Sequence, residues 1–130
     1  MYCLDTNIVV DLFRGDNLLN EKITDLGEES VDIFITPISL CELYKGAYLY
    51  HNPSKPLSDI TSFISAYHLL DFDISSCEEF GKIYASLAKN GKMIPEADLI
   101  IASIVKVNDL ILVTRDKKHF QDTGVKVEEW

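Results

Sequence analysis

Short apolar runs alternate along the chain with longer segments whose apolar residues recur at helical spacing. Five short runs predict strands, at residues 2–4, 32–36, 69–73, 110–114 and 125–127. The longer segments predict helices at about 7–13, 17–27, 37–48, 57–67, 76–88 and 95–105, with a short one after Asp116. This alternation is typical of a parallel sheet with helices on both faces. We therefore predict one three-layer α/β domain over residues 1–130.

Several of the predicted helices have clear starting signals. Thr36-Pro37 supplies an N-cap and a first-turn proline. Ser76 and Glu79 have the spacing of a capping box. The apolar stripe expected behind that box consists of Cys77, Phe80, Tyr84, Leu87 and Ala88. The helix that begins at Pro95 is apolar on nearly every side, which predicts that it lies deep in the core.

The composition excludes several classes of protein. The 130 residues include 21 acids and 12 bases, and 47% are hydrophobic, which is too apolar for intrinsic disorder. No apolar run approaches the ~20 residues of a membrane span, and the first residues lack the basic segment of a secretion signal. Three widely spaced cysteines favour a reduced, cytoplasmic protein without disulfides or zinc. Because the net charge is -9, binding of nucleic acid would need a local device such as bound cations.

Four acids lie where a ligand site is expected. Asp5 directly follows the first strand, Asp116 follows the fourth, and Glu42 and Asp98 lie on helices that begin at strand ends. Ligands of open parallel sheets bind outside these carboxyl ends. Each pair of carboxylates at ~4 Å would repel by about 4 kcal/mol at an effective dielectric of ~20, so such a cluster needs protons or cations. Oxygen ligands without His or Cys predict Mg²⁺ or Mn²⁺, which could bind a phosphodiester and activate a water.

Each acid also has an ordinary structural interpretation. Asp5 could cap the first helix, and Glu42 could pair with Lys45 one turn further along its helix. Asp98 could interact with its helix dipole, and Asp116 could be a turn residue. These interpretations treat the four acids as independent, whereas their positions at strand ends predict that they converge.

Four motifs follow one another along the chain. They are Leu4-Asp5-Thr6-Asn7, Thr36-Pro37-Ile38-Ser39-Leu40-Cys41-Glu42-Leu43, Asp98-Leu99-Ile100-Ile101-Ala102, and Leu112-Val113-Thr114-Arg115-Asp116 with His119-Phe120 behind it. Together they resemble the motifs of PIN domains, in particular the short VapC-type toxins of bacterial toxin–antitoxin systems. The resemblance runs from the first strand to the last residue. It implies a five-stranded parallel sheet of order 3-2-1-4-5, with the first strand in the middle.

The resemblance also implies a function, that of a metal-dependent endoribonuclease. Asp5, Glu42 and Asp98 would bind Mg²⁺ or Mn²⁺, and Asp116 would complete the site directly or through water. Glu96, two residues before Asp98, could share that site or compete for it. The small polar residues of the motifs would hydrogen-bond the carboxylates or metal-bound waters; they are Thr6, Asn7 and Thr114.

The partners implied by the resemblance are an RNA substrate, a small antitoxin and a second copy of the chain in a homodimer. A sequence pI near 4.6 suits an antitoxin with a basic peptide. The RNA backbone would contact the bases that flank Asp116, which are Arg115, Lys117 and Lys118, although each could be a solvated surface charge. His119 is expected to be packed or on the surface, without a partner for general-base catalysis.

Three alternatives stay open. The chain could be a PIN nuclease of RNA maturation, or a PIN-like module that binds without cleaving. It could also be a receiver-type phospho-acceptor domain, which is supported only by Asp71 and Asp73 beside the third strand. A receiver domain needs two acids after the first strand and a lysine after the fifth, and the chain has neither.

Overall fold

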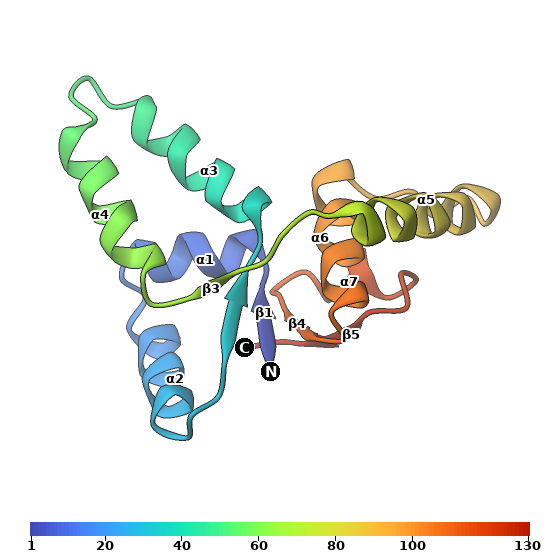
Figure 1. The fold of residues 1–130 in the computed structure, drawn as a ribbon, viewed down its shortest axis with the longest axis horizontal. Coiled ribbons are helices and arrows are strands. Elements are labelled where there is room, and N and C mark those ends of the chain that lie inside the picture. The colour runs from blue at the N-terminus through green and yellow to red at the C-terminus, as the bar shows by residue number, and fades with distance from the viewer.

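The central sheet has five strands, all parallel, in the order β3-β2-β1-β4-β5. The computed structural model describes residues 1–130, and Figure 1 shows helices on both sides of this sheet. The strands are short: β1 (Tyr2–Leu4), β2 (Ile33–Ile35), β3 (His68–Leu69), β4 (Ile111–Val113) and β5 (Lys126–Glu128). The predicted fold class and strand order are therefore confirmed.

Seven helices cover the sheet in two groups. The first group is α1 (Thr6–Phe13), α2 (Asn17–Glu28), α3 (Pro37–Tyr48) and α4 (Ser54–Ile64), and the second is α5 (Ile74–Lys89), α6 (Glu96–Val107) and α7 (Lys117–Phe120). Figure 1 shows α3 and α4 as a pair of helices that projects from the sheet, with α5 extending on the opposite side. No helix is long and apolar enough to cross a membrane.

The middle strand β1 joins two hydrophobic clusters. Successive side chains of a strand point to opposite faces of the sheet, so Cys3 packs with residues of α5 and α6 while Leu4 packs with residues of α1 and α3. Both side chains are fully buried. Helix α6 is buried along most of its length, as predicted. Burying one leucine or isoleucine stabilises the fold by about 1.5–3 kcal/mol, so α6 and β1 fix the centre of the molecule.

Two predictions in the middle of the chain are wrong. The third strand ends at Leu69: the N–H of Leu70 makes a last hydrogen bond to the carbonyl of Ile35, and the exposed residues 71–73 then lead to α5. The capping box expected at Ser76 is absent. Asp73 caps α5 instead and accepts hydrogen bonds from the N–H and the hydroxyl of Ser76 at 2.9 and 2.8 Å.

The buried face of α5 also differs from the predicted stripe. Ser76, Ile83 and Leu87 are buried, whereas Cys77 and Tyr84 of the predicted stripe are exposed. Leu87 is buried as predicted, and Phe80 packs against the core. Ser76 and Ile83 take the places expected for their neighbours Cys77 and Tyr84, a displacement of one residue or about 100° around the helix. The displacement arises because the buried positions include a serine whose hydroxyl is satisfied by the helix cap, which an apolar pattern does not detect.

Candidate active site

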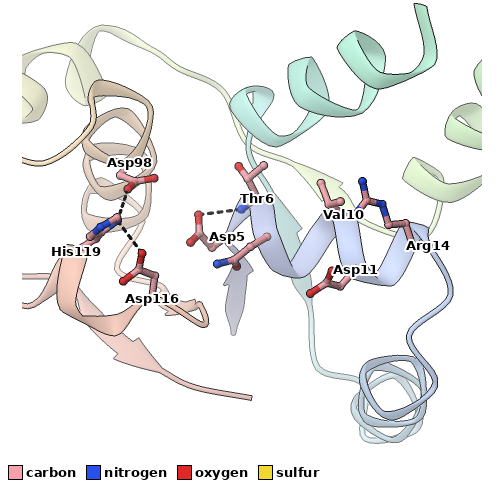
Figure 2. A pocket seen from close by; sticks show the side chains of 9 residues that line it. Asp5, Thr6, Val10, Asp11, Arg14, Asp98, Asp116 and His119 are labelled. Atoms are coloured by element: carbon pink, nitrogen blue, oxygen red, sulfur yellow. Dashed lines mark hydrogen bonds and ion pairs between the residues drawn. The ribbon is translucent and has the colours of Figure 1, made fainter. Parts of the chain in front are cut away.

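Strands β1 and β4 are neighbours, so the residues that follow them meet at one edge of the sheet. Asp5 follows β1, Asp116 follows β4, and Asp98 lies in the first turn of α6. They line a pocket of about 450 Å³, shown in Figure 2. Its lining also includes four residues of α1, the C-cap residue of that helix and one residue of α7: Thr6, Asn7, Val10, Asp11, Arg14 and His119.

Asp5 is the most buried acid of this pocket, with 4% of its surface exposed. One carboxylate oxygen accepts the backbone N–H of Thr6 at 2.8 Å, and the other accepts the hydroxyl of Thr114 at 2.6 Å. The Thr114 Oγ1 in turn accepts the backbone N–H of Asp116 at 3.0 Å. Asp5 is thus both the N-cap of α1 and a pocket residue, held by elements far apart in sequence.

The pKa of Asp5 is raised above its ordinary value, mainly because the carboxyl is buried. The negative charges of Asp98 and Asp116 raise this pKa further, while the hydrogen bonds from Thr114 and Thr6 oppose the shift. A buried carboxylate that faces two other carboxylates gains from a nearby cation. This part of the pocket is therefore electrostatically suited to a cation.

His119 lies in the site, and the expectation that it has no partner is wrong. Its Nδ1 lies 2.8 Å from Oδ2 of Asp98 and 3.0 Å from Oδ2 of Asp116 (Figure 2). An Nδ1–H there can be shared between the two carboxylates, which links α6 to α7. The spacing of Asp116 and His119 in a short helix could have revealed this pair, because residues three apart lie on one helix face.

The other predicted acids lie outside the pocket lining. Glu42 is 43% exposed in its side chain, and its Oε2 lies 2.9 Å from Nζ of Lys45. Glu96 is exposed at the start of α6. The first turn of α3 does approach the site, since the hydroxyls of Ser39 and Thr6 are 3.0 Å apart. Ser39 and Glu42 are three residues apart and lie on one side of α3.

Two polar residues after Asp5 differ in their bonding. The hydroxyl of Thr6 forms a hydrogen bond with the hydroxyl of Ser39, and the backbone N–H of Thr6 donates to Asp5. The side-chain oxygen of Asn7 is buried and has no hydrogen-bond partner in the structure. An unsatisfied buried oxygen is uncommon in folded proteins, and an ion or water at the pocket would satisfy it.

The three basic residues around Asp116 are not equivalent. Arg115 lies 3.2 Å from Asp11 and 3.3 Å from Asp16, so its charge is compensated by α1 and by the cap of α2. Lys117 and Lys118 are exposed on α7. Arg115 therefore ties the loop after β4 to the neighbouring helices.

The chemistry of the pocket fits a hard divalent cation, although its side chains are not closed around one. No three His, Cys, Asp or Glu side chains of the structure are close enough to hold a single ion. The carboxylates of Asp98 and Asp116 are instead turned to His119. The buried Asp5 and the unpartnered oxygen of Asn7 supply the oxygen-rich surroundings that Mg²⁺ and Mn²⁺ prefer.

Comparison with known proteins gives one family. The family model of the PIN domain matches residues 2–126. The relatives include Ribonuclease VapC2 of Haemophilus influenzae, which is 32% identical over 99% of this chain and 97% of its own length. The tRNA(fMet)-specific endonuclease VapC of Shigella flexneri is 28% identical over the same shares of the two chains.

Solved structures give the same result. A chain in the structure of VapBC2 from Rickettsia felis, bound to a DNA fragment from its promoter, superposes with a TM-score of 0.90 at 27% identity. The alignment covers 99% of this chain and 98% of that one. The DNA-bound VapBC of Salmonella typhimurium gives a TM-score of 0.89 at 28% identity, covering 99% and 97%.

Proposed function

The chain belongs to the PIN-domain family, among the VapC-type ribonucleases, and we propose that it is a Mg²⁺- or Mn²⁺-dependent endoribonuclease. The observation that carries the proposal is the buried Asp5, which shares one pocket with Asp98 and Asp116. Burial raises the pKa of Asp5, and the charges of Asp98 and Asp116 raise it further, so the pocket favours a bound cation.

The proposed ligands are Asp5, Asp98 and Asp116, with Glu42, which lies outside the pocket lining in the structure, as a fourth acid. Loading of the site would exchange the contacts of His119 with Asp98 and Asp116 for contacts with the ion. Glu42 would turn from Lys45 along the side of α3 that carries Ser39. A divalent cation bound there would supply Lewis-acid chemistry to a phosphodiester and lower the pKa of a water.

The residues around the acids have supporting roles in this proposal. The two hydrogen bonds to Asp5 fix its carboxylate, because Thr6 donates to one oxygen and Thr114 to the other. The bond from the Asp116 N–H to Thr114 couples the fourth acid to the same hydroxyl. Asn7 also lines the pocket, and its amide, whose oxygen is buried without a partner, is the proposed holder of a water or an ion.

We further propose RNA as the substrate and an antitoxin as the partner. The supporting relatives bear the names ribonuclease and tRNA(fMet)-specific endonuclease, and the similar solved structures are VapBC complexes. A net charge of -9 favours a basic peptide as the inhibitor of this chain. Formation of a homodimer is part of the same proposal. Lys117 and Lys118 of this chain are the candidate contacts to the RNA backbone.

The test is cleavage of total tRNA by the purified chain, free of any antitoxin. We expect cleavage with Mg²⁺ or Mn²⁺ and none with EDTA, and we expect Asp5→Asn to be inactive. Melting temperatures of both proteins show whether the variant is folded. An Asp5→Asn variant that cleaves as fast as the wild type, or cleavage that persists in EDTA, would overturn the proposal.

A further inference from the structure

The pocket is longer than its carboxylate cluster. From Asp5 it follows one face of α1 over Thr6, Asn7 and Val10 to Arg14, the C-cap residue of that helix. Residues at these intervals share a helix face. With a rise of 1.5 Å per residue, Arg14 lies about 13 Å along α1 from Asp5. A cation therefore stands at the end of the pocket opposite Asp98 and Asp116.

Arg14 is available to a ligand. It is exposed and takes part in none of the ion pairs of the structure. Asp11, three residues earlier, is the nearest acid along the helix, yet its carboxylate pairs with Arg115. Figure 2 shows the side chains of Arg14 and Asp11 pointing away from each other. Arg115 also pairs with Asp16, so the acids beside Arg14 in sequence are both compensated.

We propose that Arg14 is a phosphate-binding subsite of this pocket, which holds the RNA backbone a few nucleotides from the bond that is cut. The proposal rests on the ribonuclease function proposed above. A guanidinium matches a phosphate group with two parallel hydrogen bonds, whereas four of the eight other lining residues are acids and none is a lysine or an arginine. The strand would then run along α1, with one phosphate at the carboxylates and another at Arg14.

This subsite lets an acidic enzyme bind an acidic substrate, and it holds one phosphate at a fixed distance from the carboxylates. It also assigns different roles to the two arginines of the chain. Arg115 stabilises the loop that carries Asp116, and Arg14 binds substrate. A merely structural Arg14, placed to complement the helix dipole at the end of α1, would affect stability and leave the dependence on salt unchanged.

The experiment compares Arg14→Gln, Arg14→Lys and wild type on a transcript of the tRNA that the wild type cuts fastest in total tRNA. Arg14→Gln should raise KM about tenfold and leave kcat within about twofold, because one charge-assisted phosphate contact is lost. The slope of log(kcat/KM) against log salt should fall in magnitude by about 0.7, as for one lost contact to a single strand. Arg14→Lys should keep most of that slope.

Lys89→Gln is the matched control, because it removes one positive charge from the end of α5, outside the pocket. It should leave KM and the salt slope as in wild type.

If the wild type cleaves RNA and Arg14→Gln has the KM and the salt slope of wild type, the proposed subsite is wrong and the proposed function stands. A lower melting temperature of Arg14→Gln with an unchanged salt slope would mean that Arg14 stabilises the end of α1 and does not bind phosphate. If the wild type cleaves no RNA with Mn²⁺, the proposed function fails first.

Discussion

The two ends of the pocket differ in the sign of their charged side chains and in the partners of these side chains. At the acidic end, Asp5, Asp98 and Asp116 face one another, and the surrounding donors are a histidine ring, a hydroxyl and a backbone N–H. At the other end, Arg14 is exposed, while the neighbouring acids are already paired with Arg115. The acidic end therefore has no lysine or arginine in its lining, whereas the Arg14 end has a guanidinium without an ion-pair partner.

In the proposed function, this difference explains how an acidic chain would bind RNA. A cation would convert the acidic end into an attractive site for phosphate, whereas the Arg14 end attracts phosphate as it stands. Arg14 is exposed, whereas a buried hydrogen bond holds Asp5 and Thr114 together at the acidic end. We expect substitutions there to affect catalysis and folding, and substitutions near Arg14 to affect affinity.

The largest expected effect is that of Asp98→Asn at the acidic end. Loss of this charge should lower kcat/KM by at least about a hundredfold, as for loss of one electrostatic partner of a transition state. Glu96→Gln is the control, because Glu96 lies in the same helical turn, is exposed and does not line the pocket. Rates measured on tRNA with Mn²⁺ should separate the two variants. Equal losses in both would mean that general charge, not the pocket, matters.

Thr114→Val should have the next largest effect. The hydroxyl donates to Asp5 and accepts from the Asp116 N–H, so its loss leaves a buried carboxylate oxygen and a partly buried N–H without this partner. We expect a cost of about 1–3 kcal/mol in the free energy of unfolding. Affinity for Mn²⁺ should fall about 10–100-fold, the usual result of losing a residue that orients a metal ligand.

Thr123→Val is the matched control for Thr114→Val. Thr123 is also buried, and its hydroxyl donates to the carbonyl of Phe120, away from the carboxylates. It should lower stability in denaturant titration while the affinity for Mn²⁺ stays as in wild type. Unchanged Mn²⁺ binding by Thr114→Val would show that this hydroxyl serves the fold alone.

Asp5→Asn should raise stability without metal. Because the pKa of Asp5 is raised in the folded protein, wild-type stability falls as pH rises through that pKa. The variant lacks this penalty, so its melting temperature in EDTA should be a few degrees higher at neutral pH. The gap should close as pH falls toward the ordinary pKa of 3.8. Thermal melts against pH test this, with the exposed Asp71→Asn as a control that shows no gap.

The smallest effect is expected from Arg115→Gln. Exposed ion pairs contribute little, so the melting temperature should fall only slightly. The released Asp11 can then pair with Arg14 three residues further on, and KM for RNA should rise about twofold. Adding Asp11→Asn to Arg115→Gln should restore the wild-type KM. A double variant with the KM of Arg115→Gln would show that Asp11 does not compete for Arg14.

The sequence predicts the fold well because its strongest patterns lie in the centre. The strand at Tyr2–Leu4 and the apolar helix after Pro95 pack where the patterns indicate. The third strand is misplaced because residues 71–73 are exposed and belong to the approach to α5. A two-residue edge strand has little pattern of its own, and its position depends on the neighbouring β2.

At the site, the pattern of strands and helices predicts where the acids lie, but it does not predict which side chains they contact. The strand ends indicate Asp5 and Asp116, and the structure brings both to one pocket with Asp98. The contacts of His119 depend on how α7 packs beside α6, which spacing along the chain does not fix. The ion pair of Glu42 with Lys45, in contrast, is the one that their spacing along the helix predicts. Contacts between elements far apart in sequence, such as those of His119 with Asp98, are made by tertiary structure.

The most direct test of the central claim is Mn²⁺ binding followed by electron paramagnetic resonance of the free ion. Wild type and Glu96→Gln should bind Mn²⁺ alike, and Asp98→Asn should bind it at least about tenfold more weakly. This result would establish the acidic end of the pocket as the cation site, independently of any RNA. Equal binding by wild type and Asp98→Asn, or no binding by the wild type, would contradict the account.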